Sequence, residues 1–169
     1  MPSPSARPAV GTIPTNARAA ALRMLAQRRL TEAQLWKKLT AKGYDDTATA
    51  AAVASCKRDG FIDDDLFATL YVEGARKAVG DARLVAELVK RGIDRDAARE
   101  RVAQAPSGQT ERIGIAYEKL TRTRPQLSYP SAARALERLG FPTALIYRTL
   151  RERASAAFTT VGEEGFATE

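Results

Sequence analysis

Histidine is absent from this sequence of 169 residues, and cysteine occurs once, at Cys56. Without histidine, the chain lacks the commonest general base, the Ser-His and Cys-His pairs of nucleophilic enzymes, and the ligand of most zinc sites. Phosphate-binding loops and dinucleotide fingerprints are also missing. Basic residues follow Cys56 and would favour its thiolate, but a lone cysteine in a helical stretch is more simply explained as structural. We therefore predict no enzyme activity and no catalytic, cofactor-binding or metal-binding residues.

The single cysteine and the short apolar runs also bear on where the chain resides. One cysteine cannot form an intramolecular disulfide, so cysteine usage gives no sign of secretion. No apolar run approaches the roughly 20 residues that span a bilayer. The N-terminus lacks the order of basic and then apolar residues that marks a signal peptide. We predict a cytoplasmic protein with no membrane partner.

Residues that favour strands are scarce as well. Aromatic residues make up only 7% of the chain, β-branched residues are sparse, and no long run alternates between apolar and polar residues. Alanine, the best helix former, is abundant. The predicted fold class is therefore all-α.

The two ends of the chain differ from the body between them. Residues 1–15 carry four prolines and no periodic apolar pattern, which predicts a disordered leader. Residues 155–169 contain three acidic residues and no basic one, which predicts a flexible acidic tail. Regular structure is expected between these segments.

Three glycines mark a repeat in this body. Gly43, Gly92 and Gly140 lie 49 and 48 residues apart. A glycine in the left-handed conformation ends a helix at low cost, and an apolar residue after it packs back over the last turn. The pattern therefore predicts the same helix end three times. Leucine precedes each glycine by four residues and an apolar residue follows it, namely Leu39 and Tyr44, Leu88 and Ile93, and Leu136 and Phe141.

Each glycine ends the second of three predicted helices, so we divide the body into three-helix repeats over 16–61, 62–105 and 106–154. In the first repeat, Thr31 and Gln34 form a capping-box pattern that begins the second helix. The flanking helices of that repeat are predicted over 16–28 and 46–58.

Apolar spacing predicts the first helices of the other two repeats. Three acidic residues at 63–65 precede the helix of the second repeat, and a favourable interaction with the helix dipole explains them more simply than a metal site does. The residues expected on one apolar face are Phe67, Leu70 and Tyr71 in the second repeat, and Ile113, Tyr117 and Leu120 in the third.

Basic residues outnumber acidic ones by 27 to 20, and they gather in the outer repeats. The net charge is +5 in the first repeat, −1 in the second and +5 in the third. Two basic repeats around a near-neutral one suit a protein that lies along an extended polyanion or bridges neighbours in a polymer. Two simpler explanations stay open, a mixed charge that only keeps the surface soluble and a helical solenoid that only presents a surface.

Lysines and arginines are accordingly the candidate contacts with protein or DNA. Lys37, Lys38 and Lys42 should point away from the buried leucines of their helix, and Arg134 and Arg138 should share one face of the matching helix in the third repeat. The full set of candidates is Lys37, Lys38, Lys42, Arg76, Lys77, Arg83, Lys90, Arg91, Arg122, Arg124, Arg134 and Arg138.

An independent DNA-binding module of the helix-turn-helix type is the alternative function, and a scaffold that binds only protein is a third. A helix-turn-helix protein would place the third helix of a repeat in the major groove. In the first repeat that helix has almost no long polar side chain before its last turn, so it would read few bases. The other repeats are better suited, with Arg95 and Arg99 or Arg148 and Arg151.

The run GFIDDDLFATLYVEGARKAVGDARLVAELVKRGID, residues 60–94, resembles the central signature of the bacterial regulatory protein RecX family. The resemblance extends over about residues 18–150. The sequence departs from the family pattern between Tyr71 and Gly80, and Asp81 stands where proline is usual. The residues that match are Phe61 and Ile62, Asp63 and Asp64, Phe67 and Ala68, Tyr71, Arg76 and Lys77, Gly80, Arg83 and Leu84, Glu87 and Leu88, and Gly92.

This resemblance implies three tandem three-helix repeats that form an elongated, curved body. It also implies that the protein binds the filament that the recombinase RecA forms on single-stranded DNA. Inhibition of filament growth, ATP hydrolysis, strand exchange and repressor co-cleavage would follow, with a place in homologous recombination, DNA repair and the SOS response. A monomer without cofactor is expected, and duplex DNA stays open as a further partner.

Overall fold

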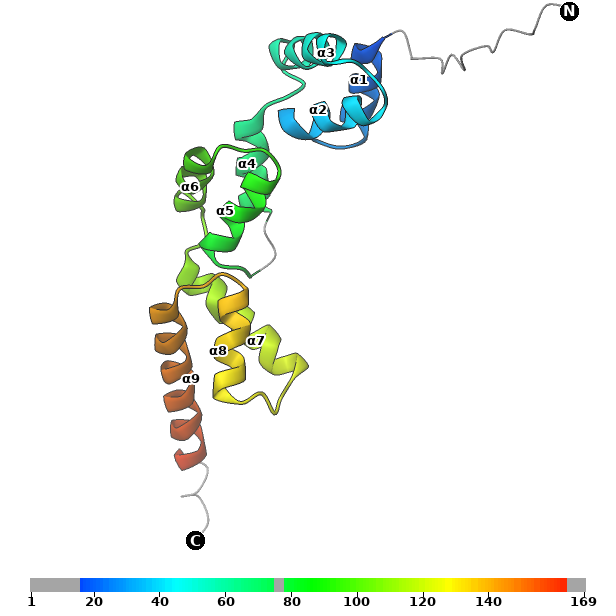
Figure 1. Cartoon of the computed structure of the whole chain (residues 1–169). Helices are drawn as coiled ribbons and strands as arrows, with labels where there is room; N and C mark the ends of the chain where they lie inside the picture. Colours follow the sequence, from blue (N-terminus) through cyan, green and yellow to red (C-terminus); the bar gives the residue numbers. More distant parts are fainter. Residues whose placement is uncertain (1–15, 75–77, 164–169) are drawn as a thin grey trace, which may run out of the picture. The chain divides into compact units, whose positions relative to one another are not determined.

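The computed structural model describes residues 16–74 and 78–163, with side chains described through residue 155. Arg76, Lys77 and the predicted leader over 1–15 lie outside the described residues, as does the end of the predicted tail. All regular structure in the described part of the chain is α-helical, which confirms the predicted fold class (Figure 1).

The helices nearly coincide with the predicted ones in the first repeat. Helix α1 (Ala17–Gln27) and helix α3 (Asp46–Arg58) match the predictions over 16–28 and 46–58. The remaining helices are α2 (Glu32–Ala41), α4 (Asp64–Glu73), α5 (Asp81–Lys90), α6 (Arg95–Ala103), α7 (Gln109–Thr123), α8 (Tyr129–Arg138) and α9 (Thr143–Glu163).

The chain divides into two compact units, and the boundary lies inside α4, between Phe67 and Ala68. The first unit contains α1, α2 and α3, and the second contains α5 through α9 (Figure 1). Because the second unit includes helices from two predicted repeats, the division into three repeats stays a prediction.

Small side chains build much of the core of the first unit. Ala20 and Ala21 of α1 are buried beside Leu35 and Leu39 of α2 and Cys56 of α3. Since alanine adds little bulk to a helix surface, helices can pack at short interaxial distances where alanines meet. The other buried members of this cluster are Ala17, Leu30, Tyr44, Ala52, Val53 and Ile62.

The predicted capping box at the start of α2 is confirmed. The Thr31 hydroxyl accepts a hydrogen bond from the backbone N–H of Gln34 at 3.2 Å. The Gln34 side chain in turn accepts one from the backbone N–H of Thr31 at 3.3 Å. Two of the unpaired donors at this helix end are thereby satisfied.

Larger side chains fill the core of the second unit. Ile113 of α7, Leu136 of α8 and Leu150 of α9 are buried together, and Tyr117 and Leu120 pack against them. The predicted apolar face of α7 is therefore confirmed. In α5, the buried residues are Leu84 and Leu88.

The three repeat glycines end their helices as predicted. Gly43, Gly92 and Gly140 have φ values of 87°, 92° and 86°, the left-handed region that favours glycine. The N–H of Tyr44 donates to the carbonyl of Leu39 at 3.3 Å, and the equivalent bonds at the other two glycines measure 3.2 and 3.4 Å. This pattern is the Schellman motif, and the apolar residue after each glycine is buried.

Helix α4 differs from the prediction in the face that it buries. Its buried residues are Ala68 and Val72, whereas Leu70 is 41% exposed and Phe67 and Tyr71 are only half-buried. The face of α4 that packs into the core is therefore not the apolar face that the larger residues predicted. Residue size alone did not decide the packing, because the smaller alanine and valine are the residues that face the core.

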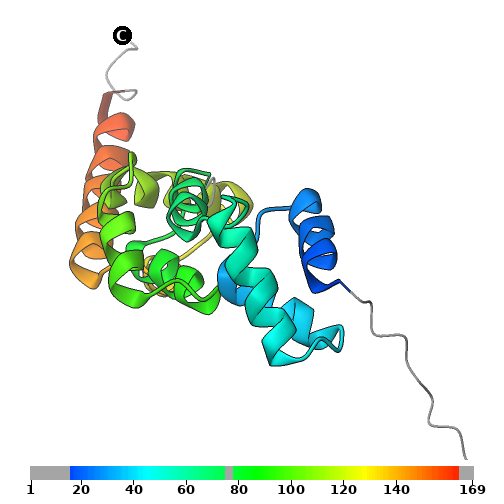
Figure 2. The ribbon, with the colours of Figure 1, turned by 90° about the horizontal axis from the view of Figure 1, so that it is seen from above.

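Helix α9 extends beyond the predicted end of the third repeat at residue 154. It continues to Glu163, and Figure 2 shows it as one uninterrupted helix. The sequence between Pro142 and Gly162 contains neither glycine nor proline, so no strong helix breaker interrupts this stretch. The first residues of the predicted flexible tail are helical for this reason.

Candidate functional site

The acidic run at 63–65 caps helices. The Asp63 carboxylate accepts a hydrogen bond from the N–H of Leu66 at 2.8 Å at the start of α4. The Asp64 carboxylate accepts one from the N–H of Glu32 at 2.9 Å at the start of α2. Burial raises the pKa of Asp64, and the bond from Glu32 opposes that rise. Among the described residues, no group of acidic or cysteine side chains is arranged to bind a metal ion.

Cys56 lies in the core of the first unit with no exposed surface. Burial raises the pKa of its thiol, while the charge of Arg18 lowers it by a smaller amount. A protonated, buried thiol is neither a good nucleophile nor accessible to a substrate. The geometry therefore agrees with the structural interpretation of this cysteine.

Helix α2 and its C-cap residue carry the three lysine candidates of the first unit. Lys37 and Lys42 are exposed and Lys38 is half-buried, so they lie away from the buried leucines as predicted. None of the three forms an ion pair in the part of the chain that the structure describes. Trp36, which is 37% exposed, lies on the same helix. This helix thus combines unpaired cations with an accessible aromatic ring.

The arginine candidates in α5 and at its C-cap are engaged in contacts within the second unit. Arg83 pairs with Glu87 at 3.2 Å. The guanidinium of Arg91 lies 4.3 Å from the centre of the Tyr71 ring, and the Tyr71 hydroxyl donates to Glu87. Burial and then the bond to Glu87 raise the pKa of Tyr71. Lys90 on the same helix is exposed and forms no ion pair among the described residues.

The candidates of α7 and α8 are exposed. Arg122 and Arg124 lie at the end of α7, and Arg134 and Arg138 lie on α8. None of these four side chains forms an ion pair in the described ranges 16–74 and 78–163. Their charges are therefore available to a partner.

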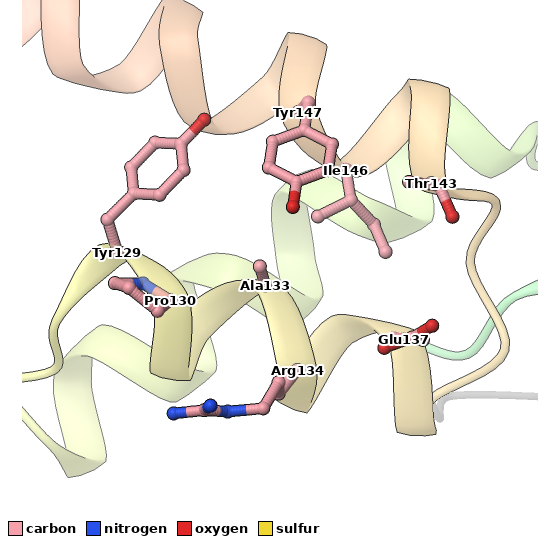
Figure 3. A pocket seen from close by; sticks show the side chains of 8 residues that line it. All are labelled: Tyr129, Pro130, Ala133, Arg134, Glu137, Thr143, Ile146 and Tyr147. Atoms are coloured by element: carbon pink, nitrogen blue, oxygen red, sulfur yellow. The ribbon is translucent and has the colours of Figure 1, made fainter.

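A groove of about 290 Å³ separates the exposed sides of α8 and α9 (Figure 3). Tyr129 and Tyr147 lie on its two sides, 45% and 47% exposed, with ring centres 6.2 Å apart and planes inclined by 29°. Arg134 and Glu137 line it from α8, and Ile146 lines it from α9. The sequence analysis missed both tyrosines.

The turn between α8 and α9 packs directly against the start of α5. The N–H of Gly80 donates to the carbonyl of Leu139 at 2.8 Å. A Cβ atom at Gly80 would lie 2.0 Å from the carbonyl oxygen of Gly140, and one at Gly140 would lie 2.7 Å from Arg83. The two backbones approach so closely because neither glycine has a side chain.

Comparison with known proteins places this chain among regulatory proteins. A family model described as RecX, first three-helix domain, matches residues 17–56. Regulatory protein RecX of Thermobifida fusca is 32% identical over 147 residues, which cover 83% of this chain and 80% of that protein. Regulatory protein RecX of Thermus thermophilus is 30% identical over 137 residues, which cover 81% of this chain and 92% of that protein. This chain belongs to the RecX family.

Solved RecX structures share the fold. A crystal structure of regulatory protein RecX matches with a TM-score of 0.72 at 20% identity and covers 80% of this chain and 71% of its own. RecX from Lactobacillus salivarius matches with a TM-score of 0.70 at 20% identity, over 83% of this chain and 95% of its own. No described helix of this RecX protein is both long and apolar enough to cross a membrane.

Asp81, where the chain departs from the RecX pattern, pairs with a buried arginine. The Arg112 side chain on α7 is only 5% exposed, and its guanidinium contacts the Asp81 carboxylate. The same guanidinium donates to the carbonyl of Val79 at 3.0 Å, and the Gln109 side chain accepts the N–H of Asp81 at 3.3 Å. In this RecX protein, an ion pair between α5 and α7 stands at the position of the usual proline.

The spacing of the repeats could have identified the two tyrosines that the sequence analysis missed. Tyr129 lies as far before Gly140 as Asp81 lies before Gly92, so both stand at the start of the second helix of a repeat. Tyr147 and Arg99 are likewise equivalent relative to those glycines. Aligning the repeats in full would have singled out the two tyrosines as a departure from the other copies.

Proposed function

We propose that this RecX-family protein binds the filament of the recombinase RecA on single-stranded DNA and inhibits its activities. Those activities are filament growth, ATP hydrolysis, strand exchange and repressor co-cleavage. The main support is membership of a family of regulatory proteins together with basic side chains that lack an acidic partner among the described residues. A DNA filament is a polyanion that such side chains can contact. The protein would act in the cytoplasm as a monomer, without catalysis of its own.

The test is the DNA-dependent ATPase of the cognate recombinase. Adding the purified protein at a stoichiometric or higher ratio should lower the rate of ATP hydrolysis and slow filament growth. Light scattering or electron microscopy of the filaments would follow growth independently. An unchanged ATPase rate at these ratios would rule the proposal out.

Charge reversal tests which side chains make the contact. Lys37→Glu with Lys38→Glu, or Arg134→Glu with Arg138→Glu, should weaken inhibition, because these cations form no ion pair among the described residues. Helicity by circular dichroism should stay the same. The matched control is Arg23→Glu with Arg29→Glu, which makes the same charge change at exposed positions outside the candidate set. Equal inhibition by all three variants would show that the candidate residues are wrong.

An independent helix-turn-helix module is the second candidate function. Arg95 and Arg151 lie on the third helices of their repeats and are exposed, whereas Arg99 pairs with Asp96 at 3.0 Å. A strong preference for one duplex sequence over others of equal length would favour this candidate. Binding that falls steeply with salt and does not depend on sequence would favour contact with phosphates alone.

A further inference from the structure

The groove between α8 and α9 differs from its counterpart in the preceding repeat. A second groove, between α5 and α6, is lined by Asp81, Val85 and Arg99. Tyr129, Ala133 and Tyr147 stand at the equivalent positions of the next repeat and line the groove of about 290 Å³. Two equivalent positions of the grooves are therefore charged in one copy and aromatic in the other.

The two tyrosine side chains of the groove are partly exposed. Each is nearly half exposed, and their centres lie 6.2 Å apart. Flat aromatic rings of this kind stack on nucleobases with little regard to sequence, because every base has a π-face. A groove lined by large aliphatic side chains would favour an apolar side chain instead, but Ile146, the largest aliphatic residue of the lining, is only 2% exposed. The large exposed rings of the lining are therefore those of the two tyrosines.

Charge around the groove favours an anionic ligand. Arg134 lines the groove, and Arg138 and Arg151 lie exposed on the same two helices with no ion pair among the described residues. Glu137 is the acidic side chain in the lining. Figure 3 shows Glu137 at the Thr143 end of the groove, whereas Arg134 extends toward the end formed by Tyr129. A phosphate group is therefore favoured at the Tyr129 end.

We propose that this groove binds an unpaired nucleobase of single-stranded DNA, which stacks on Tyr147 and Tyr129 while Arg134 contacts the neighbouring phosphate. This inference builds on the proposed function, because it identifies where the chain contacts the DNA strand of the filament. It is also testable without the recombinase, since a base and its phosphate are present in any single strand.

The first experiment compares two substitutions of one ring. Binding of a fluorescein-labelled thymidine oligonucleotide is measured by anisotropy at low salt for the wild type, Tyr147→Phe and Tyr147→Leu. Phenylalanine keeps the stacking face, so its Kd should stay close to that of the wild type. Leucine removes the face, so its Kd should rise at least about fivefold. Ile115→Ala changes a residue on α7 that is 49% exposed and outside the groove, and should leave Kd unchanged.

The second experiment separates bases from phosphates. An abasic oligonucleotide of equal length keeps the phosphates and lacks the bases, so the wild type should bind it at least as weakly as Tyr147→Leu binds the normal strand. Tyr147→Leu, which keeps only the Tyr129 ring, should discriminate less between the two strands than the wild type does. Arg134→Gln should reduce the slope of log Kd against log salt by about one, because one phosphate contact is lost.

Several outcomes would overturn the inference. These are undetectable binding of the thymidine oligonucleotide by the wild type at low salt, equal binding of the normal and abasic strands, or an unchanged Kd for Tyr147→Leu with intact helicity. If Tyr147→Leu instead loses binding to the recombinase in the absence of DNA, the groove accepts a protein segment and the inference is wrong. Inhibition of the ATPase without strand binding that depends on Tyr147 would leave only the proposed function standing. Strand binding that depends on Tyr147, without inhibition of the ATPase, would leave only this inference standing.

Discussion

Gly43 of the first unit and Gly140 of the second end equivalent helices, but their surroundings differ. Both have a positive φ, at 87° and 86°. A Cβ atom at Gly43 would meet no other described atom within 4 Å, whereas one at Gly140 would lie 2.7 Å from the backbone nitrogen of Arg83. The first glycine therefore serves only to end its helix. The second also allows another part of the chain to pack against that end.

Gly80→Ala should reduce the stability of the second unit more than any other variant discussed below, since it places a methyl group 2.0 Å from a backbone carbonyl oxygen. Backbone atoms cannot move aside as a flexible side chain can, so we expect the second unit to lose about 3 kcal/mol or more in free energy of unfolding. Circular dichroism in denaturant would measure the loss. Trp36, the single tryptophan, lies in the first unit, so the fluorescence transition should change less.

Gly108→Ala is the matched control for that variant. Both glycines precede the first residue of a helix with nearly the same backbone, φ and ψ being −74° and 163° at Gly80 and −68° and 160° at Gly108. A Cβ atom at Gly108 would meet nothing described within 4 Å. We expect a loss of only about 0.5–1 kcal/mol there, because glycine is a better N-cap residue than alanine. Equal losses for the two variants would mean that the close approach at Gly80 does not contribute to stability.

The pair Gly140→Ala and Gly43→Ala comes next. Each places alanine in the left-handed region, which costs about 1–2 kcal/mol. Gly140→Ala adds a steric clash with Arg83, which we expect to cost about 1–3 kcal/mol more. Denaturant titration of the two variants should therefore show a clear difference. Identical losses would mean that the second unit relaxes around the added methyl group.

Arg112→Met should destabilise the second unit by about 2 kcal/mol. The substitution keeps an unbranched apolar chain but leaves the carbonyl of Val79 without its donor and Asp81 without its partner. Because Asp81 is 35% exposed, water can hydrate its carboxylate in part, which limits the loss. Arg153→Met is the control, since it breaks an exposed pair with Glu118 and should cost under about 1 kcal/mol.

The smallest effect concerns the pH dependence of stability. The backbone N–H groups of Ala97 and then Asp96 hold the pKa of Asp94 below its usual value of about 4. A carboxylate with a lowered pKa contributes its full stability above the unfolded pKa and loses it as the pH falls through the folded pKa. Asp94→Asn keeps a capping oxygen that does not titrate. The free energy of unfolding of the wild type should therefore fall relative to Asp94→Asn between about pH 5 and pH 2. A constant difference over this range would contradict the prediction.

The helix ends could be predicted from the sequence because each is specified within a few consecutive residues. Leucine, glycine and an apolar residue at fixed spacing suffice for the Schellman motif, and a Thr-Gln spacing suffices for the capping box. Gly60 has the same left-handed conformation, with φ at 76°. The backbone N–H of Phe61 donates to the backbone carbonyl of Cys56 at 2.8 Å. The sequence analysis did not single out this fourth helix end.

The contacts between distant residues could not be predicted in the same way. Gly80 meets Gly140, Asp81 meets Arg112, and Tyr129 stacks with Tyr147. Each pair depends on how separate helices pack, and residue types alone do not specify which partners meet. The buried face of α4 was wrong for the same reason, since neighbouring elements and not the largest residues determine which side of a helix is covered.

The approach of Gly80 to Gly140 also limits how this unit can change over generations. Two contacting side chains can change by compensating substitutions, because a larger residue on one helix can be matched by a smaller one on the other. Two backbones that touch offer no such exchange, since any side chain at either position meets atoms that cannot be replaced. We expect random mutagenesis followed by selection for folded protein to return glycine at both positions, with no compensating change elsewhere. We therefore expect the substitutions that keep this unit folded to lie at other positions.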